Sequence, residues 1–293
     1  MALSRGATTQ GAAEPGQSLR LREPPARPRT VVLVAVGWLA LSWAVVVASD
    51  GLDLFGWQAH LAEPWWQALF FNRRPTEWLQ WTSLAAAYGG ALYLAARIRP
   101  LGDDRLSRFL IWFGVGAGLM LIEDAGDVRH IIALYVRRAL DDSLVLGLHP
   151  ATLVDVPYFA ALAFPLLYAL ARYGRRVWQA REARPYVALA YAAYGLAAVG
   201  SALSGVGGGR HEQSVYLGSL YERMGGALVR ALPGDQWATG GLEPAHFRFQ
   251  IIDALVEESL ELIGAACMLA VVVALARSFT GAGSQPSSGT SPS

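Results

Sequence analysis

The stretch Leu121-Ile-Glu-Asp-Ala-Gly-Asp-Val-Arg-His130 places three carboxylates, an arginine and a histidine inside an otherwise apolar run. A second apolar run, distant along the chain, contains Asp253-Ala-Leu-Val-Glu-Glu-Ser-Leu-Glu261. Ionisable side chains are rare in membrane-spanning helices, where they usually face the interior of a helix bundle and mark a functional site. If the apolar runs around them cross a membrane, these two stretches are the candidate functional site of the protein.

The composition is that of a membrane protein. The 293-residue chain is 54% hydrophobic and only 16% charged, which is unusual for a soluble domain of this length. The net charge of +1 gives no indication of a nucleic-acid partner. The single cysteine, Cys267, excludes a disulfide framework and a cysteine-rich metal site. All 24 basic residues are arginines, which excludes a retinal Schiff base and a P-loop, and we expect no nucleotide or haem.

Hydrophobic runs predict an all-α, polytopic membrane protein with six transmembrane helices, because about 20 helical residues cross a bilayer core. Residues 1–29 and 279–293 are polar or rich in Gly, Ser and Pro, and we predict disordered tails there. Segments 50–77 and 207–250 are predicted to lie at the extracytoplasmic membrane interface, the first through its tryptophans and the second through an amphipathic helix. The predicted spans cover residues 31–49, 78–98, 109–136, 153–171, 186–206 and 251–276.

The arginines predict the orientation of the chain in the membrane. They gather in the N-terminal tail and in the loops that follow the second and the fourth predicted span. The positive-inside rule therefore places both termini in the cytoplasm. The lysine-free, alanine-rich composition is typical of a GC-rich bacterial genome. We therefore expect a bacterial inner-membrane protein whose helices contact the lipid bilayer.

The rise of an α-helix predicts that the two acidic stretches meet. Counted from the inner face at about 1.5 Å per residue, Glu123 on the third span and Glu261 on the sixth lie roughly 21 to 22 Å up. Asp155, near the outer end of the fourth span, lies about 25 Å up by the same count. Three separate spans thus place carboxylates in one band of the membrane, towards its outer surface.

The angular positions favour one acidic face on each helix. At about 100° per residue, Glu123, Asp127 and His130 share a face of the third span, whereas Arg129 projects to its far side. The acids of the sixth span share a face in the same way. Carboxylates in contact with lipid cost several kcal/mol, so we expect both faces to turn inward.

Carboxylates at close range cannot all remain ionised unless their charge is compensated: they share protons, pair with cations or bind a metal. An oxygen-rich set with one imidazole suits a hard or borderline divalent ion such as Fe, Mn, Ca or Mg, and suits zinc less well. The predicted metal ligands are Glu123, Asp127, His130, Glu257, Glu258 and Glu261, with Asp155 and Asp124 as outer ligands.

The sequence leaves three functions open. A bound metal would activate water in a membrane metalloenzyme. The same acids would couple proton or cation movement to a solute in a transporter, although span three has no ionisable group between Phe109 and Met120 to continue a path inward. In a structural or assembly subunit, the acids would pair with arginines and only hold the helices in register.

Overall fold

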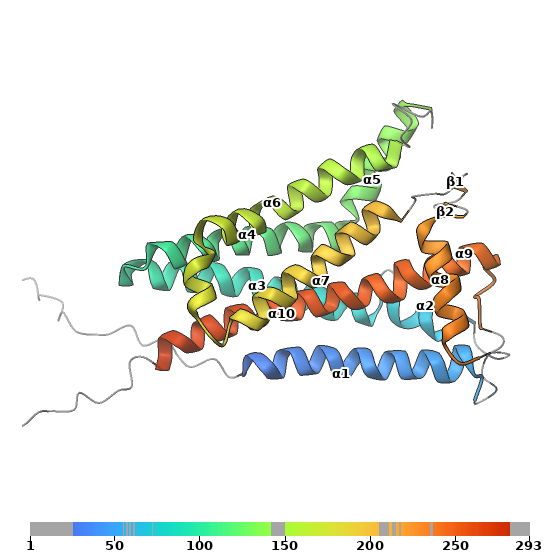
Figure 1. Cartoon of the computed structure of the whole chain (residues 1–293), viewed down its shortest axis with the longest axis horizontal. Coiled ribbons are helices and arrows are strands. Elements are labelled where there is room, and N and C mark those ends of the chain that lie inside the picture. Colours follow the sequence, from blue (N-terminus) through green and yellow to red (C-terminus); the bar gives the residue numbers. More distant parts are fainter. Residues whose placement is uncertain are drawn as a thin grey trace, which may run out of the picture.

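The computed structural model describes residues 26–54, 56, 58, 60, 62–71, 73–141, 150–204, 211–212, 215–216, 218–234 and 237–281. Most of the two predicted tails, residues 1–25 and 282–293, lies outside the described residues. The described part is a bundle of long helices that run along one axis in alternating directions (Figure 1). The prediction of an all-α protein is confirmed, apart from a pair of two-residue strands.

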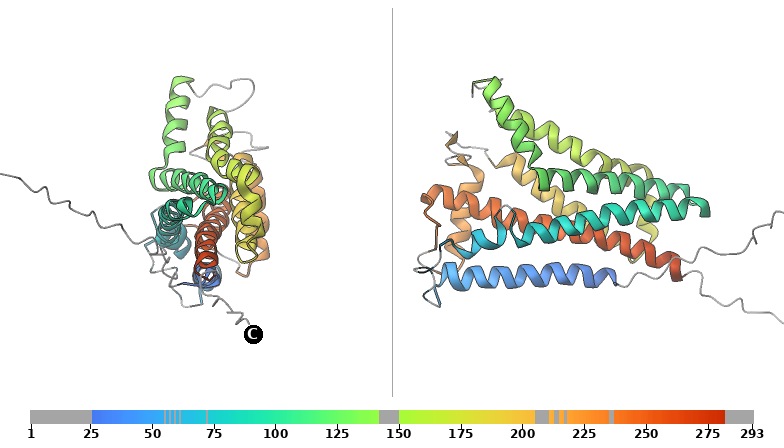
Figure 2. Two further views of the ribbon diagram at one scale, coloured as in Figure 1. Left: turned by 90° about the vertical axis from the view of Figure 1, so that its left-hand side faces the viewer. Right: turned by 180° about the vertical axis from the view of Figure 1, so that it is seen from behind.

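Six long helices build the bundle, and shorter elements cover one of its ends (Figure 2). π-Helical segments continue α1 through Val47–Gly51 and precede α10 at Ile251–Glu257. The antiparallel strands β1 (His211–Glu212) and β2 (Val215–Tyr216) pair His211 with Tyr216. The long helices are α1 (Pro28–Val46), α3 (Pro75–Ile98), α4 (Asp104–Gly126), α6 (Pro150–Gln179), α7 (Arg184–Leu203) and α10 (Glu258–Gly281). The short helices are α2 (Trp65–Phe70), α5 (Val128–Ala139), α8 (Leu220–Ala231) and α9 (Pro244–Gln250).

Five helices of the described part are long and apolar enough to cross a membrane, which indicates a multi-pass membrane protein. α3, the second predicted span, is not among them, although its 24 residues pack against α4 and α10. Polar side chains such as Gln80 and Ser83 and the aromatic residues in its first half make α3 less apolar than its neighbours. The five helices are Pro28–Gly51, Asp104–Gly126, Leu153–Gln179, Arg184–Leu203 and Pro244–Phe279.

The third predicted span, residues 109–136, is wrong as a single helix. α4 ends at Gly126, Asp127 adopts a left-handed backbone with φ of 50°, and α5 begins at Val128. Aspartate is one of the few non-glycine residues that tolerate this conformation, and it stops the helical hydrogen-bond ladder. α5 leaves the bundle in a new direction (Figure 2). Residues beyond Asp127 therefore do not follow the angular count that starts at Glu123.

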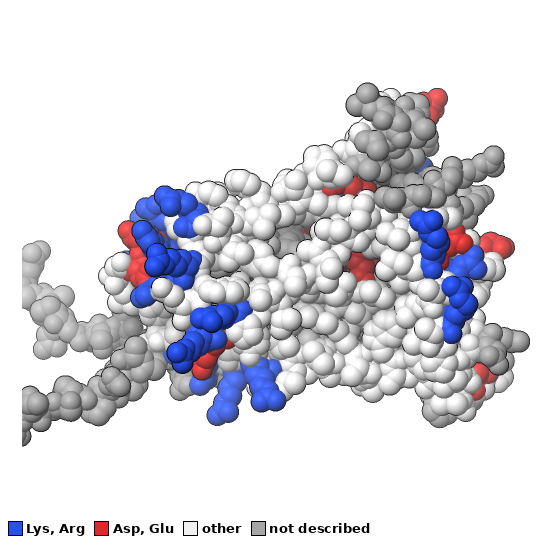
Figure 3. Space-filling view, viewed as in Figure 1, with Lys and Arg blue, Asp and Glu red and all other residues white. Residues whose placement is uncertain are grey.

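One end of the bundle has a closely packed apolar core. Phe109 and Phe113 are fully buried and stack with their ring centroids 5.4 Å apart. Gly114 lets α3 approach α4 closely, because a Cβ at this position would lie 3.2 Å from the Cδ2 atom of Leu92. The loops at this end carry exposed arginines, and Figure 3 shows them as a basic cluster beside a middle with few charged atoms.

The opposite end is covered by the short helices. Asp50 is fully buried, and its carboxylate accepts hydrogen bonds from the backbone N–H groups of Trp65 at 3.0 Å and Trp66 at 2.7 Å. Asp50 thereby satisfies the first N–H groups of α2, as a capping residue does. Trp66 and Phe70 are fully buried inside this cover. The amphipathic helix expected within residues 207–250 is α8, which packs against α9.

Candidate functional site

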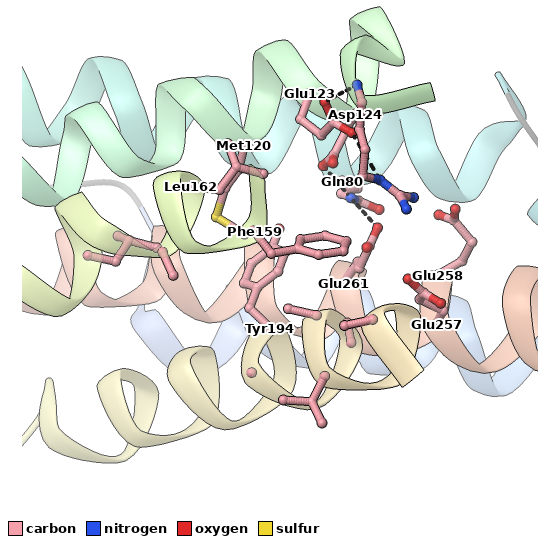
Figure 4. Close-up of a pocket in the computed structure, with 18 of the residues that line it drawn as sticks. Gln80, Met120, Glu123, Asp124, Phe159, Leu162, Tyr194, Glu257, Glu258 and Glu261 are labelled. Atoms are coloured by element: carbon pink, nitrogen blue, oxygen red, sulfur yellow. Dashed lines mark hydrogen bonds and ion pairs between the residues drawn. The ribbon is translucent and has the colours of Figure 1, made fainter. Parts of the chain in front are cut away.

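A cavity of about 800 Å³ lies between α3, α4, α6, α7 and α10, on the side of the bundle where α5 leaves. Its polar part consists of carboxylates with Gln80 and Arg129, and its apolar part includes Met120, Phe159 and Leu162. Figure 4 shows that Asp124, Gln80 and Glu261 point toward one another, with Glu257 and Glu258 beside them. The cavity is thus polar on one side and apolar on the other, as ligand sites commonly are.

The Gln80 amide joins three helices at the polar side of the cavity. Its Nε2 atom donates hydrogen bonds to Asp124 Oδ2 at 2.6 Å and to Glu261 Oε2 at 3.0 Å. Gln80 is only 1% exposed, and its Oε1 atom is buried without a hydrogen-bond partner among the described residues. A buried acceptor without a partner costs about 1–3 kcal/mol, so this oxygen is available to a donor that enters the cavity.

Arg129 compensates the charge of two carboxylates at one side of the cavity. Its Nη1 atom lies 3.2 Å from Asp155 Oδ1, and its Nε atom lies 3.6 Å from Glu123 Oε1. Tyr158 donates a hydrogen bond to Glu123 at 2.6 Å, and the Phe159 ring centroid lies 4.9 Å from the guanidinium carbon. Burial lowers the pKa of Arg129, but the nearby carboxylates, Asp155 first, outweigh burial and raise it above its ordinary value. The Nε atom of Arg129 is nevertheless buried without a hydrogen-bond partner among the described residues.

The sequence-based position of Arg129 is therefore wrong. The angular count placed it on the far side of the helix from Glu123, whereas the structure brings the two side chains together. The reason is the break at Asp127, which redirects the chain before Arg129. The Arg129 backbone N–H also donates to Glu123 Oε2 at 3.1 Å, so Glu123 accepts a hydrogen bond from the start of α5.

Four other acids of the cavity, on α4, on α10 and on the π-helical segment before α10, lack such an ion pair. None of the ion pairs among the described residues includes Asp124, Glu257, Glu258 or Glu261. Glu257 accepts a hydrogen bond from the Tyr221 hydroxyl at 2.8 Å, and burial, together with Glu257, raises the pKa of Tyr221. Glu258 Oε2 is buried without a hydrogen-bond partner in the described part of the chain. Ionised carboxylates left in this state would cost several kcal/mol each.

Two aromatic residues of the cavity wall also carry unsatisfied polar atoms. The indole Nε1 of Trp81 and the hydroxyl of Tyr194 are buried and have no hydrogen-bond partner within the described residues. The Tyr194 ring lies against Gly264 of α10, where a Cβ would come within 2.5 Å of it. Only glycine at this position leaves room for the ring. Trp81 and Tyr194 therefore offer both aromatic surface and hydrogen-bonding groups to a ligand.

The eight predicted ligands occupy three different settings. Asp127 and His130 lie at the exposed edge of the cavity and hydrogen-bond to each other, with side chains 54% and 64% exposed. Asp155 is bound to Arg129. The other five, Glu123, Asp124, Glu257, Glu258 and Glu261, line the cavity. Across the described residues, no group of three or more His, Cys, Asp or Glu side chains is arranged to hold a metal ion, so the predicted metal site gains no support.

The sequence did not indicate several residues that line the cavity or hydrogen-bond to its acids. Glu77 was placed just outside the second predicted span, yet it is 8% exposed and lines the cavity together with Gln80. Two polar residues three positions apart on an apolar helix lie on the same face, and this spacing was a usable signal. Tyr158 and Tyr221 carried no comparable signal, because their hydrogen bonds to Glu123 and Glu257 depend on the tertiary fold.

Comparison with known proteins gives no further constraint: no family model, curated protein or solved structure matches this chain.

Proposed function

We propose that this chain is a multi-pass inner-membrane protein whose intramembrane cavity binds an organic cation. The supporting observation is the imbalance of charge in the cavity wall. Eight carboxylates line it, against two arginines and one histidine. Arg129 forms its ion pairs with Glu123 and Asp155, and no ion pair among the described residues includes Glu258 or Glu261 of α10. Protons compensate these acids in the absence of the ligand, and the cation replaces protons when it binds.

An organic cation fits this cavity better than a divalent metal does. A metal of this class requires several oxygen ligands around one point, and the described residues form no such group. The cavity instead combines acids with the aromatic rings of Phe159, Tyr194 and Trp81. Aromatic faces attract organic cations, and the contact between Arg129 and Phe159 is an example within the site.

The cavity has its entrance towards one side of the bundle. Beyond its apolar wall, α3, α4 and α10 pack through Leu94, Ile98, Phe109 and Val271, which are at most 2% exposed. No Asp, Glu, Arg or His occurs on α4 between Phe109 and Met120 or on α10 between Leu262 and Ala276. This supports a binding site with one entrance rather than a continuous path for a transported ion.

We further propose that α3 is a sixth crossing helix and that both termini face the cytoplasm. α3 has the length of a span, and exposed arginines concentrate at the end of the bundle where α1 begins and α10 ends (Figure 3). Green fluorescent protein fused after the last residue should fluoresce in a bacterial host, because it folds in the cytoplasm and not after export. A dark but full-length fusion would contradict this orientation.

Equilibrium binding of radiolabelled tetraphenylphosphonium tests the cation site. We expect saturable binding to the purified protein in a non-ionic detergent. The double variant Glu258→Gln with Glu261→Gln should weaken binding by at least about tenfold, because it removes two negative charges next to the ligand. The matched control is Asp104→Asn, which neutralises an exposed carboxylate at the arginine-rich end and should leave affinity within about twofold.

Three results would contradict the proposal. Absence of saturable binding to the wild type removes the cation site. Equal affinity of the wild type and the double variant shows that the cavity acids do not take part. Stoichiometric divalent metal in the purified wild type that is lost in the double variant would instead restore the metal hypothesis.

A further inference from the structure

We infer that the ligand is an amphiphile that enters sideways from the lipid phase, between α6 and α7. This inference rests on the proposed cation site and adds the class of ligand and its route. The cation would lie against the acids of α10, and its apolar chain would lie against the walls formed by α6 and α7.

The first observation is the separation of α6 from α7. α6 packs chiefly against α4 and α5, whereas α7 packs chiefly against α10. The two helices come together near the arginine-rich end, where the Tyr191 hydroxyl donates a hydrogen bond to the Leu166 carbonyl at 2.6 Å. Toward the end where α5 lies, both helices line the cavity, α6 through Val156 and Phe159 and α7 through Val199 and Ala202.

The second observation is that residues of this gap belong to the cavity wall and to the outer surface at the same time. Val156 and Leu167 of α6 and Val199 of α7 line the cavity, and their exposed fractions are 56%, 55% and 58%. Figure 3 shows acidic atoms at the surface in the otherwise uncharged middle of this face. The cavity therefore opens on the part of the molecule that the apolar helices would place in lipid.

The third observation is the chemistry of the two walls. On α7 the cavity wall is made mostly of small residues, including Ala190, Ala197, Ala198 and Ala202, which leave space along the helix. Across the gap, α6 contributes Phe159, Leu162 and Leu166. These walls offer no charge, whereas the far side carries Glu257, Glu258 and Glu261 (Figure 4). An apolar chain with a cationic head matches this division, and its chain needs no contact with water on the way in.

Competition against tetraphenylphosphonium by alkyltrimethylammonium ions of increasing length tests the inference on the wild type itself. The protein would be held in nanodiscs of zwitterionic lipid, and free competitor would be measured after separation. Decyltrimethylammonium should compete at least about tenfold more strongly than tetramethylammonium after correction for its partition into lipid-only discs. Equal potency of the two would overturn the lipid route while leaving the cation site intact.

Substitutions in the gap provide a second test. Ala198→Trp places a large side chain in the wall of small residues. It should weaken the binding of decyltrimethylammonium by at least about tenfold and leave the affinity for tetramethylammonium within about twofold. Ala192→Trp is the matched control, since Ala192 is exposed on α7 but does not line the cavity, and it should change neither. An equal loss for both ions in Ala198→Trp would overturn the inference. Failure of every cation to bind the wild type would remove the proposed function and this inference together.

Discussion

The two halves of the bundle are built on different principles. At the arginine-rich end, α3, α4, α7 and α10 interlock through small and aromatic residues such as Gly114, Phe109 and Phe113, and this core is apolar. In the other half, the same helices surround a cavity lined by acids and by buried polar atoms that have no hydrogen-bond partner in the described part of the chain. The packed half therefore stabilises the fold. The hollow half is less stable, because its buried polar groups remain available to bind a ligand.

The difference is visible even within the acids of the cavity. Glu123 has Arg129 and Tyr158 as partners, so it belongs to the framework that holds α4, α5 and α6. Glu258 has a buried oxygen without a partner, and none of the ion pairs among the described residues includes it. A carboxylate that is paired with a cation, such as Glu123, should stabilise the fold. A carboxylate without an ion pair, such as Glu258, should destabilise the fold and be available to bind a ligand.

The largest expected effect is that of breaking the framework pair. Arg129→Met leaves Glu123 and Asp155 without their cation and should lower the free energy of unfolding by roughly 3–5 kcal/mol. Thermal unfolding in detergent, followed by circular dichroism, measures the change. The control is Arg176→Met, which breaks an ion pair with Asp103 in which the arginine is 60% exposed, and it should cost less than about 1 kcal/mol. Equal losses of unfolding free energy in Arg129→Met and Arg176→Met would refute the claim that the Arg129 pairs hold the framework together.

A substitution in the packed half should have the next largest effect. Phe109→Ala opens a cavity in a core where the ring is fully buried, and we expect a loss of roughly 2–4 kcal/mol. Leu167→Ala removes a side chain that is 55% exposed at the edge of the hollow half, and it should cost less than about 1 kcal/mol. The same unfolding assay compares the two. A larger loss for Leu167→Ala would show that the hollow half carries the stability.

The acids should respond with opposite signs. Glu258→Gln removes a carboxylate without an ion-pair partner and should leave the protein equally stable or raise its stability by about 1 kcal/mol. Glu123→Gln removes the partner of Arg129 and should lower stability by roughly 2–4 kcal/mol. Unfolding of both variants at neutral pH gives the comparison. A clear loss in Glu258→Gln would favour the alternative in which the acids only hold helices together.

The smallest expected effect concerns an acid outside the cavity. A hydrogen bond from Arg248 at 2.6 Å lowers the pKa of Glu222 below its ordinary value. The stabilisation from this pair is therefore fully present above the ordinary glutamate pKa and is lost as pH falls through the lowered value. Since Arg248 is 38% exposed and screened by solvent, we expect less than about 1 kcal/mol. Glu222→Gln should thus lower the melting temperature slightly at pH 7, and this difference from the wild type should shrink as the pH falls through the lowered pKa. A difference that is the same at every pH would contradict the assignment of the ion pair.

The sequence was sufficient for the helices and for the two acidic stretches. Hydrophobic length located most of the long helices, and the spacing of apolar residues located α8. Simple helix arithmetic also placed Glu123 and Glu261 at similar heights, and both line one cavity. These features depend on local periodicity, which a single sequence contains.

The sequence was insufficient where the backbone departs from a regular helix or where contacts are tertiary. The left-handed Asp127 ended α4 and reversed the predicted position of Arg129. Gln80 bridges Asp124 and Glu261, and that bridge required knowledge of how α3 packs between α4 and α10. The composition of α3 also made it the weakest candidate for a span, although its length matches the others.

The exchange of protons for a cation is the most direct test of the account. Calorimetric titration of the wild type with tetraphenylphosphonium, in buffers that differ in ionisation enthalpy, counts the protons released when the cation binds. About one proton should be released per cation, and binding should strengthen as pH rises, because protons and the cation compete for the same carboxylates. The double variant Glu258→Gln with Glu261→Gln should abolish the release. Saturable binding with no proton release at any pH, unchanged in the double variant, would contradict the central claim.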